Sequence, residues 1–232
     1  GVAGVAIDLG ATAQDLNNQD GLISSKGLLS IAHLRDLNNQ NGVINSKGVL
    51  SIDTLRNLNN QKGEISSVNS FSLKGNSLDN RGGNLISNDQ LTLTAAELKN
   101  QGGLVSGWNG VSVTGGTLDN SQQGSVSSLL GNTSIDLSGA LTNHSKGGVG
   151  AKGEVSIKAA SLDNSNGTVS SGGKQTLALT GGTLSNASGG LIESGDALDV
   201  RAASLDNSGG RVTAKKALTF TGTHLNNSNG SL

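Results

Sequence analysis

The feature that most constrains this chain is a Leu-x-Asn triplet that recurs along almost its whole length. Eleven copies follow one another at intervals of 20 to 23 residues. The middle position varies among Asn, Asp, Lys, Thr and Ser, whereas the third position is Asn in every copy, which indicates an inward-facing Asn and an outward-facing middle residue. The triplets begin at Leu16, Leu37, Leu58, Leu78, Leu98, Leu118, Leu141, Leu162, Leu184, Leu205 and Leu225.

Each period contains three apolar stations, of which the triplet Leu is the first. The stations are separated by Gly-rich segments, and the third is an alternating apolar pair, so the pattern predicts three short strands and three turns per period. We assign the second station to Ile23, Ile44, Ile65, Ile86, Val105, Val126, Val149, Val169, Ile192 and Val212. The third station is assigned to Leu29/Ile31, Leu50/Ile52, Phe71/Leu73, Leu91/Leu93, Val111/Val113, Ile135/Leu137, Val155/Ile157, Leu177/Leu179, Leu198/Val200 and Leu218/Phe220.

A period of this length, made of three very short strands, cannot bury its own apolar face and must stack on its neighbours. With roughly 4.8 Å between equivalent strands, about ten to eleven coils would form a rod roughly 50 Å long. The sequence therefore predicts an all-β parallel β-helix that forms one domain over residues 1–232. A leucine-rich repeat, which shares the period range, remains the alternative fold, although it needs Asn three residues after a Leu and a helix-forming segment that these Gly-rich stretches lack.

The invariant Asn has a physical explanation in such a stack, because each side-chain amide can hydrogen-bond to the coils on either side. We expect a structural ladder of Asn18, Asn39, Asn60, Asn80, Asn100, Asn120, Asn143, Asn164, Asn186, Asn207 and Asn227. A Gly five residues after most triplet leucines fits a turn with positive φ. These glycines are Gly21, Gly42, Gly63, Gly83, Gly103, Gly167, Gly189, Gly210 and Gly230, with displaced counterparts at Gly124 and Gly147-Gly148.

Composition narrows the possible functions. Sixteen basic residues balance seventeen acidic ones without a long basic run, which argues against nucleic acid or an anionic membrane as a partner. The chain has no Cys and only three His, and no apolar run long enough to span a bilayer, so we expect no cofactor and no metal. It begins at Gly1 without an export signal and carries no polar cap, so we expect a fragment of a longer array.

Segments such as Ser204-Leu205-Asp206-Asn207-Ser208-Gly209-Gly210-Arg211-Val212-Thr213-Ala214 resemble the repeats of filamentous haemagglutinin and of contact-dependent growth-inhibition surface proteins. The resemblance covers about residues 7 to 232. It implies a right-handed β-helix shaft, secreted by an outer-membrane two-partner secretion transporter to the surface of a Gram-negative bacterium. It also implies an adhesin, or a stick that presents a distal binding or toxin domain to a receptor or glycan on a host cell or neighbouring bacterium. No toxin-boundary motif or export-recognition domain occurs in this stretch.

Candidate contact residues are few. Trp108 is the one large aromatic, in an expected turn, and Leu129 and Leu130 fall in the period that is three residues longer than its neighbour; these three are candidates for contact with a receptor or glycan. A carbohydrate-active enzyme or glycan-binding module is the alternative function. The outward Asp79, Asp119, Asp163 and Asp206 do not occupy adjacent coils as a catalytic pair requires, and His33, His144 and His224 lie apart, so we predict no enzyme.

Two further motifs are more simply explained as features of an Asn-rich and Gly-rich chain. Calcium-binding β-rolls need Gly-Gly-x-Gly-x-Asp, which does not occur here. Asn-x-Ser/Thr sequons occur at Asn132, Asn143, Asn186 and Asn226, but two of these belong to the expected ladder and could not point inward while glycosylated.

Overall fold

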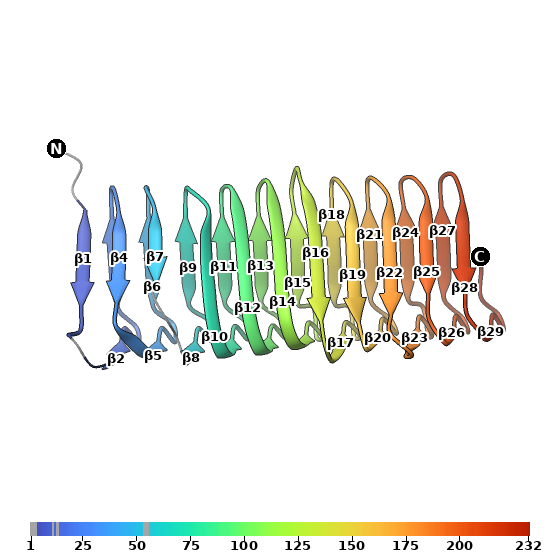
Figure 1. Ribbon diagram of the computed structural model, residues 1–232, viewed down its shortest axis with the longest axis horizontal. Coiled ribbons are helices and arrows are strands. Elements are labelled where there is room, and N and C mark those ends of the chain that lie inside the picture. The colour runs from blue at the N-terminus through green and yellow to red at the C-terminus, as the bar shows by residue number, and fades with distance from the viewer. Residues whose placement is uncertain (1–3, 11, 13, 53–55) are drawn as a thin grey trace.

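The computed structural model describes residues 4–10, 12, 14–52 and 56–232. The elements found in this part of the chain are 29 β-strands. Figure 1 shows them side by side in one long row that runs in chain order from the N-terminal to the C-terminal end. Within the described residues, no helix is long and apolar enough to cross a membrane.

The strands form three faces, which we number by the station that each carries. The first face holds β2 (Gln14–Asn17), β5 (Leu34–Asn38), β8 (Asn57–Asn59), β17 (Ala140–Thr142), β20 (Ser161–Asp163), β23 (Thr183–Ser185), β26 (Ser204–Asp206) and β29 (His224–Asn226). The second face holds β3 (Leu22–Ser25), β6 (Val43–Ser46), β9 (Glu64–Ser67), β11 (Asn84–Ser87), β13 (Leu104–Gly107), β15 (Ser125–Ser128), β18 (Gly148–Ala151), β21 (Thr168–Ser171), β24 (Leu191–Ser194) and β27 (Arg211–Ala214).

The third face holds β1 (Val5–Asp8), β4 (Leu29–Ala32), β7 (Leu50–Ile52), β16 (Asn132–Leu137), β19 (Val155–Ala159), β22 (Gln175–Leu179), β25 (Leu198–Arg201) and β28 (Leu218–Thr221). Three longer strands run from the third face onto the first without a turn: β10 (Phe71–Asp79), β12 (Gln90–Lys99) and β14 (Gly110–Asp119). They belong to the stretch where the triplets are only 20 residues apart.

All the strand pairs in the described residues are parallel, and they join equivalent strands of neighbouring coils. Between β12 and β14, for example, Leu91 lies opposite Val111 and Leu98 opposite Leu118. Because a parallel strand repeats its side-chain orientation coil after coil, residues of one station form a continuous column. The triplet leucines from Leu37 to Leu205 are all buried in this way. The structure confirms the predicted all-β parallel solenoid with three strands per coil.

Three station assignments are wrong, and strand register explains each correction. Leu85, rather than Ile86, pairs with Ile65 and Val105 and is buried. A shift of one residue turns a side chain to the opposite face of a strand, so Ile86 lies on the outer side.

Register likewise places Thr133 and Ile135 opposite the pair that begins at Val111, and Gln175 opposite Val155. The third-station pairs in these two coils are therefore Thr133/Ile135 and Gln175/Leu177. Two polar side chains, Thr133 and Gln175, thus occupy the core at 1% and 0% exposure. The hydroxyl of Thr133 donates to the backbone carbonyl of Gly150 at 2.7 Å, whereas Nε2 of Gln175 has no hydrogen-bond partner.

Candidate functional site

The eleven triplet asparagines lie in one column along the first-turn edge, which we define as the turns that join first-face to second-face strands. These turns comprise residues 18–21, 39–42, 60–63, 80–83, 100–103, 120–124, 143–147, 164–167, 186–190, 207–210 and 227–230. Nδ2 of each asparagine donates to Oδ1 of the asparagine in the next coil at 2.7–2.8 Å. The longer period between Asn120 and Asn143 does not interrupt the column.

Asn80 shows how the remaining polar groups of a ladder residue are engaged. Nδ2 of Asn80 donates to the carbonyl of Leu104 in the next coil at 3.1 Å, and the backbone N–H of Asn80 donates to the carbonyl of Lys99 at 2.7 Å. The carbonyl of Asn80 accepts from the N–H of Gly83 at 3.0 Å. Since an Asn amide has two donors and one acceptor oxygen, little capacity remains for an outside ligand. The chemistry of this column is therefore internal to the stack.

The glycines beside the ladder serve a different purpose from the one predicted. A Cβ on Gly103 would meet the backbone carbonyl of Asn80 and lie 2.6 Å from Oδ1 of Asn100. Positive φ is found one residue earlier, as at Lys62 (55°) and Gly102 (63°). The expectation of positive φ is confirmed at Gly189 and wrong at the other eight predicted glycines, such as Gly103, where the close approach of two coils requires Gly.

In the period that begins at Leu184, the glycine beside the ladder lies one residue later than predicted. Gly189 has a φ of 86° and open space around its Cα, whereas Gly190 abuts the ladder residues Asn164 and Asn186. Gly190, rather than Gly189, is therefore the column glycine of this coil.

A second polar column, which the sequence reasoning missed, closes the turns that join second-face to third-face strands. Ser46 Oγ donates to the carbonyl of Gly27 at 2.7 Å and accepts from the N–H of Gly48 at 3.2 Å. The sequence contains a signal for this column, because in most periods the buried apolar residue of the second face is followed two positions later by Ser. This column comprises Ser25, Ser46, Ser67, Ser87, Ser128, Ser171 and Ser194, with Gly107, Ala151 and Ala214 at the equivalent positions.

The outward carboxylates Asp79, Asp119, Asp163 and Asp206 cap first-turn backbone groups. Asp119 Oδ1 accepts from the N–H of Ser121 at 3.0 Å, and Asp206 Oδ1 accepts from the N–H of Ser208 at 3.0 Å. Hydrogen bonds from the side chain and then from the backbone of Ser208 hold the pKa of Asp206 below its ordinary value. Each of these carboxylates thus has a local structural partner.

The histidines lie in separate coils. His33 Nδ1 pairs with Asp8 at 2.7 Å, His144 with the Ser145 hydroxyl at 2.8 Å, and His224 with the Thr223 hydroxyl at 2.9 Å. Within the described part of the chain, no group of three His, Cys, Asp or Glu is arranged to hold a metal ion.

The three candidate contact residues lie together on what we call the second-turn edge. This edge consists of the turns between second-face and third-face strands, residues 26–28, 47–49, 68–70, 88–89, 108–109, 129–131, 152–154, 172–174, 195–197 and 215–217. Leu129 N–H donates to the Gly107 carbonyl and Leu130 N–H to that of Trp108, so these residues are neighbours across two coils. Trp108, Leu129 and Leu130 are 46%, 52% and 56% exposed.

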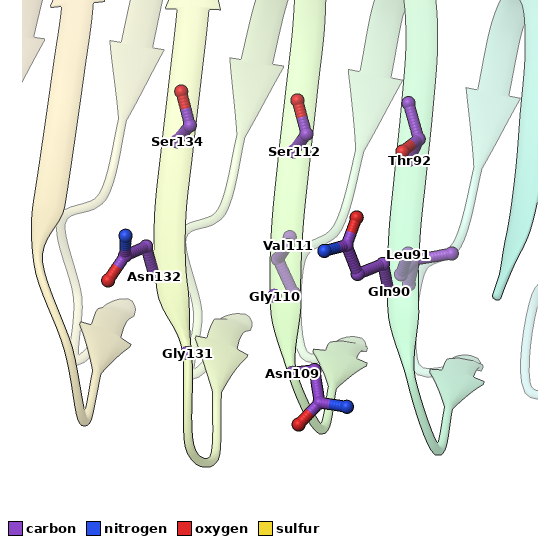
Figure 2. Close-up of a pocket in the computed structure, with 10 residues that line it drawn as sticks. All are labelled: Gln90, Leu91, Thr92, Asn109, Gly110, Val111, Ser112, Gly131, Asn132 and Ser134. Carbon is purple, nitrogen blue, oxygen red and sulfur yellow. The ribbon is translucent and has the colours of Figure 1, made fainter.

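A shallow hollow of about 270 Å³ lies on the third face beside this edge. Figure 2 shows Gln90 and Asn132 on either side of Gly110, with Thr92, Ser112 and Ser134 in a row across three neighbouring strands. Its lining contains amides, hydroxyls and apolar groups but no charged side chain: Gln90, Leu91, Thr92, Asn109, Gly110, Val111, Ser112, Gly131, Asn132 and Ser134. The missing side chain of Gly110 opens the middle of the hollow.

The coils stack in parallel, and the asparagine ladder forms its hydrogen bonds within the stack. This arrangement defines a structural solenoid of the repeat-protein class. The family model of the haemagglutinin repeat matches the chain in five overlapping stretches, residues 1–33, 32–95, 67–145, 131–186 and 171–232. The chain therefore belongs to the haemagglutinin repeat family, whose members are characteristic of secreted, surface-exposed adhesins. Comparison with curated proteins and with solved structures finds no significant match.

Proposed function

We propose that this chain is a shaft segment of a large, secreted bacterial surface protein of the filamentous haemagglutinin type. The observation that carries the proposal is the uninterrupted ladder from Asn18 to Asn227, which links every coil to the next. A chain built to form a cleft or a hinge would interrupt this column. Here the ladder continues even across the longest period, as expected of a segment that serves to extend the parent protein.

The proposed mechanism is mechanical. Each coil adds roughly 4.8 Å, so ten coils extend the parent protein by roughly 50 Å. Because each coil contacts only its neighbours, a longer array would extend the shaft without changing its cross-section. The segment would thus carry a distal binding or toxin domain away from the surface of a Gram-negative cell, after export of the parent through an outer-membrane two-partner secretion transporter.

Trp108, Leu129 and Leu130 support a second part of the proposal, a contact between this segment and a host cell or neighbouring bacterium. Large exposed apolar side chains that cluster on a surface are common at interaction sites. A repeated array of shafts would make such contacts multivalent, so weak single contacts would suffice.

Cell binding of the labelled fragment tests this contact. We expect saturable binding to epithelial or bacterial cells, and at least about tenfold weaker binding of Trp108→Ala, within the range seen for interface aromatics. Asn88→Ala, at the equivalent exposed position one coil away, is the matched control and should bind normally. Failure of the folded, β-rich wild-type fragment to bind either cell type would refute the contact and leave only the shaft.

The hollow around Gly110 favours a second candidate function, a glycan-binding module. Uncharged sugars are recognised through hydrogen bonds to amides and hydroxyls, and these are the polar side chains that line the hollow. Its volume of about 270 Å³ suits a small saccharide unit, since pockets for larger ligands begin at about 300 Å³. Gly110→Ala would partly fill the hollow without a clash, because its Cβ would have no neighbour nearer than 3.6 Å. Selective loss of neutral-glycan binding in this variant would support the module.

A further inference from the structure

Exposed apolar side chains are unevenly distributed over the solenoid. Ten large hydrophobic residues are exposed in the described part of the chain, and six of them lie on the second-turn edge: Leu28, Val49, Val68, Trp108, Leu129 and Leu130. The other four, Leu22, Leu218, Leu225 and Leu232, belong to the coils at the two ends. The first-turn edge has none among its described residues. Apolar exposure is therefore a property of one edge rather than of the whole surface.

The same edge is basic as well as apolar. Six lysines lie on the second-turn edge, at Lys26, Lys47, Lys152, Lys174, Lys215 and Lys216, against three carboxylates, at Asp89, Glu154 and Asp196. The edge thus carries a net charge of +3, against −1 for the whole chain. The first-turn edge carries +2 but has no exposed large apolar side chain among its described residues, so only the second-turn edge combines the two features. In the described part of the chain, Lys216 is the one lysine of this edge within ion-pair distance of a carboxylate, 2.7 Å from Asp196. The other five remain available to an external anion.

The order along the edge places Trp108, Leu129 and Leu130 between two groups of lysines. Lys26 and Lys47 lie in the first coils, Trp108, Leu129 and Leu130 near the middle, and the remaining four lysines in the last four coils. Figure 1 shows the hairpin-like turns between second-face and third-face strands in a nearly straight row. With coils roughly 4.8 Å apart, one flat surface can contact all ten turns.

From this arrangement we propose that the second-turn edge docks lengthwise on an anionic lipid bilayer. The lysines bind headgroup phosphates, and Trp108, Leu129 and Leu130 enter the boundary between headgroups and acyl chains. Trp and Leu side chains together with basic residues are the chemistry of interfacial membrane binding. A soluble polyanion would engage the lysines but would leave the apolar side chains without a partner.

The sequence alone argued against such a partner because the lysines are far apart along the chain. The solenoid brings residues about 20 positions apart into adjacent coils, so a basic edge forms without a basic run. The inference rests on the contact part of the proposed function and names its chemistry. It is independent of the shaft role.

Trp108 provides a direct measurement because it is the only Trp in the chain. Vesicles of phosphatidylcholine with phosphatidylglycerol should shift its fluorescence to shorter wavelength and protect it from aqueous quencher. Vesicles of phosphatidylcholine alone should do neither, and added salt should reverse the effect. Equal binding to both vesicles, or binding without a fluorescence shift, would overturn the proposal.

A matched pair of charge variants separates the edge from net charge. Lys152→Glu with Lys174→Glu should weaken partitioning into anionic vesicles by about 25-fold, from the roughly fivefold that one basic residue contributes. Lys62→Glu with Lys146→Glu makes the same change in charge at exposed positions of the first-turn edge and should have little effect. Equal losses in both would mean that net charge alone governs binding and would refute the docking edge.

Leu129→Ser with Leu130→Ser should reduce the fluorescence shift and weaken partitioning at least about tenfold, because the variant loses the apolar area that both side chains would bury in the bilayer. Circular dichroism establishes that every variant is folded. Absence of vesicle binding together with retained cell binding would refute the lipid partner while leaving adhesion intact. Absence of both would refute the proposed contact itself.

Discussion

The first-turn and second-turn edges lie at opposite ends of the second-face strands and are held together in different ways. On the first-turn edge the side chain at the ladder position is Asn in all eleven coils and is fully hydrogen-bonded. On the second-turn edge the equivalent closing position is Ser in most coils but Gly107, Ala151 and Ala214 in others. Turn length varies by one residue at both edges, from four to five residues at the first turn and from two to three at the second.

The reason lies in what each turn must satisfy. At the first turn, Nδ2 of one Asn serves both an amide in the next coil and a backbone carbonyl, so the loss of one side chain leaves several buried groups unpaired. At the second turn, Ser Oγ closes a turn whose backbone is partly exposed, and water can replace it. The chain can therefore vary its composition at the second turn, and its exposed Trp, Leu and Lys residues are found there.

The largest expected effect comes from interrupting the ladder. Asn100→Ala with Asn120→Ala leaves donors and acceptors of three coils unpaired, and we expect a loss of roughly 4 kcal/mol or more in the free energy of unfolding, at about 1–3 kcal/mol for each buried group. Denaturant unfolding followed by circular dichroism measures it. Asn109→Ala on the second-turn edge, which removes one exposed hydrogen bond to Asp89, should cost less than about 1 kcal/mol. Similar losses at the two edges would contradict the comparison.

A smaller effect is expected from adding one methyl group at the two edges. Gly103→Ala places a Cβ against Asn80 and Asn100, and overpacking of this kind costs about 1–3 kcal/mol. Gly110→Ala adds the same methyl beside the second-turn edge, where its nearest neighbour would be 3.6 Å away. Thermal unfolding of the two variants should therefore differ by several degrees. A Gly103→Ala protein as stable as Gly110→Ala would show that the coils can separate at the ladder.

The fold could be predicted from the sequence because the same residue types recur at equivalent positions of successive periods. Eleven repetitions of one Asn outweigh the ambiguity of any single period, and Leu91, Val111 and their equivalents follow in register. The misplaced stations, at Ile86 and at Gln175, are cases in which an apolar neighbour made two registers equally plausible. Only the pairing of the strand with both neighbouring coils decides between them.

The contact edge was harder to predict because its members are not repeated. Trp108 and Leu130 were found as unusual residues, but the lysines around them gave no signal one at a time. Likewise, the close approach at Gly103 depends on the distance between coils, which no single period encodes. Properties shared by every coil are readable in sequence, whereas properties of an edge appear only after stacking.

Gln175, which directly follows the second-turn edge, offers a gain in stability instead of a loss. Its Nε2 is buried and unpaired between Val155 and Leu198. Gln175→Leu should raise the free energy of unfolding by about 1 kcal/mol, because it removes an unsatisfied polar group of similar size. Thr133→Val is the matched case, since it also removes a core polar group but one that donates to Gly150, and it should give no gain. A destabilised Gln175→Leu protein would show that its Oε1, which accepts from Ser171, matters more than the unpaired nitrogen.

The smallest effect concerns the carboxylates that cap first turns. The pKa of Asp206 is lowered in the folded protein by Ser208, so this cap contributes stability that is present above the unfolded value of about 3.9 and is lost as pH falls through the folded value. Asp206→Asn keeps the acceptor oxygen, as Asn17 and Asn38 do at equivalent positions, and should be neutral at pH 7. Below about pH 4 the free energy of unfolding of this variant should fall less than that of the wild type. The difference should be about a few tenths of a kcal/mol, because the site is partly exposed. Asp196→Asn on the second-turn edge, where the partner is Lys216, should instead lose its ion pair at neutral pH, and its difference from the wild type should shrink as salt is added. Identical pH and salt profiles for the two variants would mean that the backbone caps of the first turn are no different from ordinary surface charges.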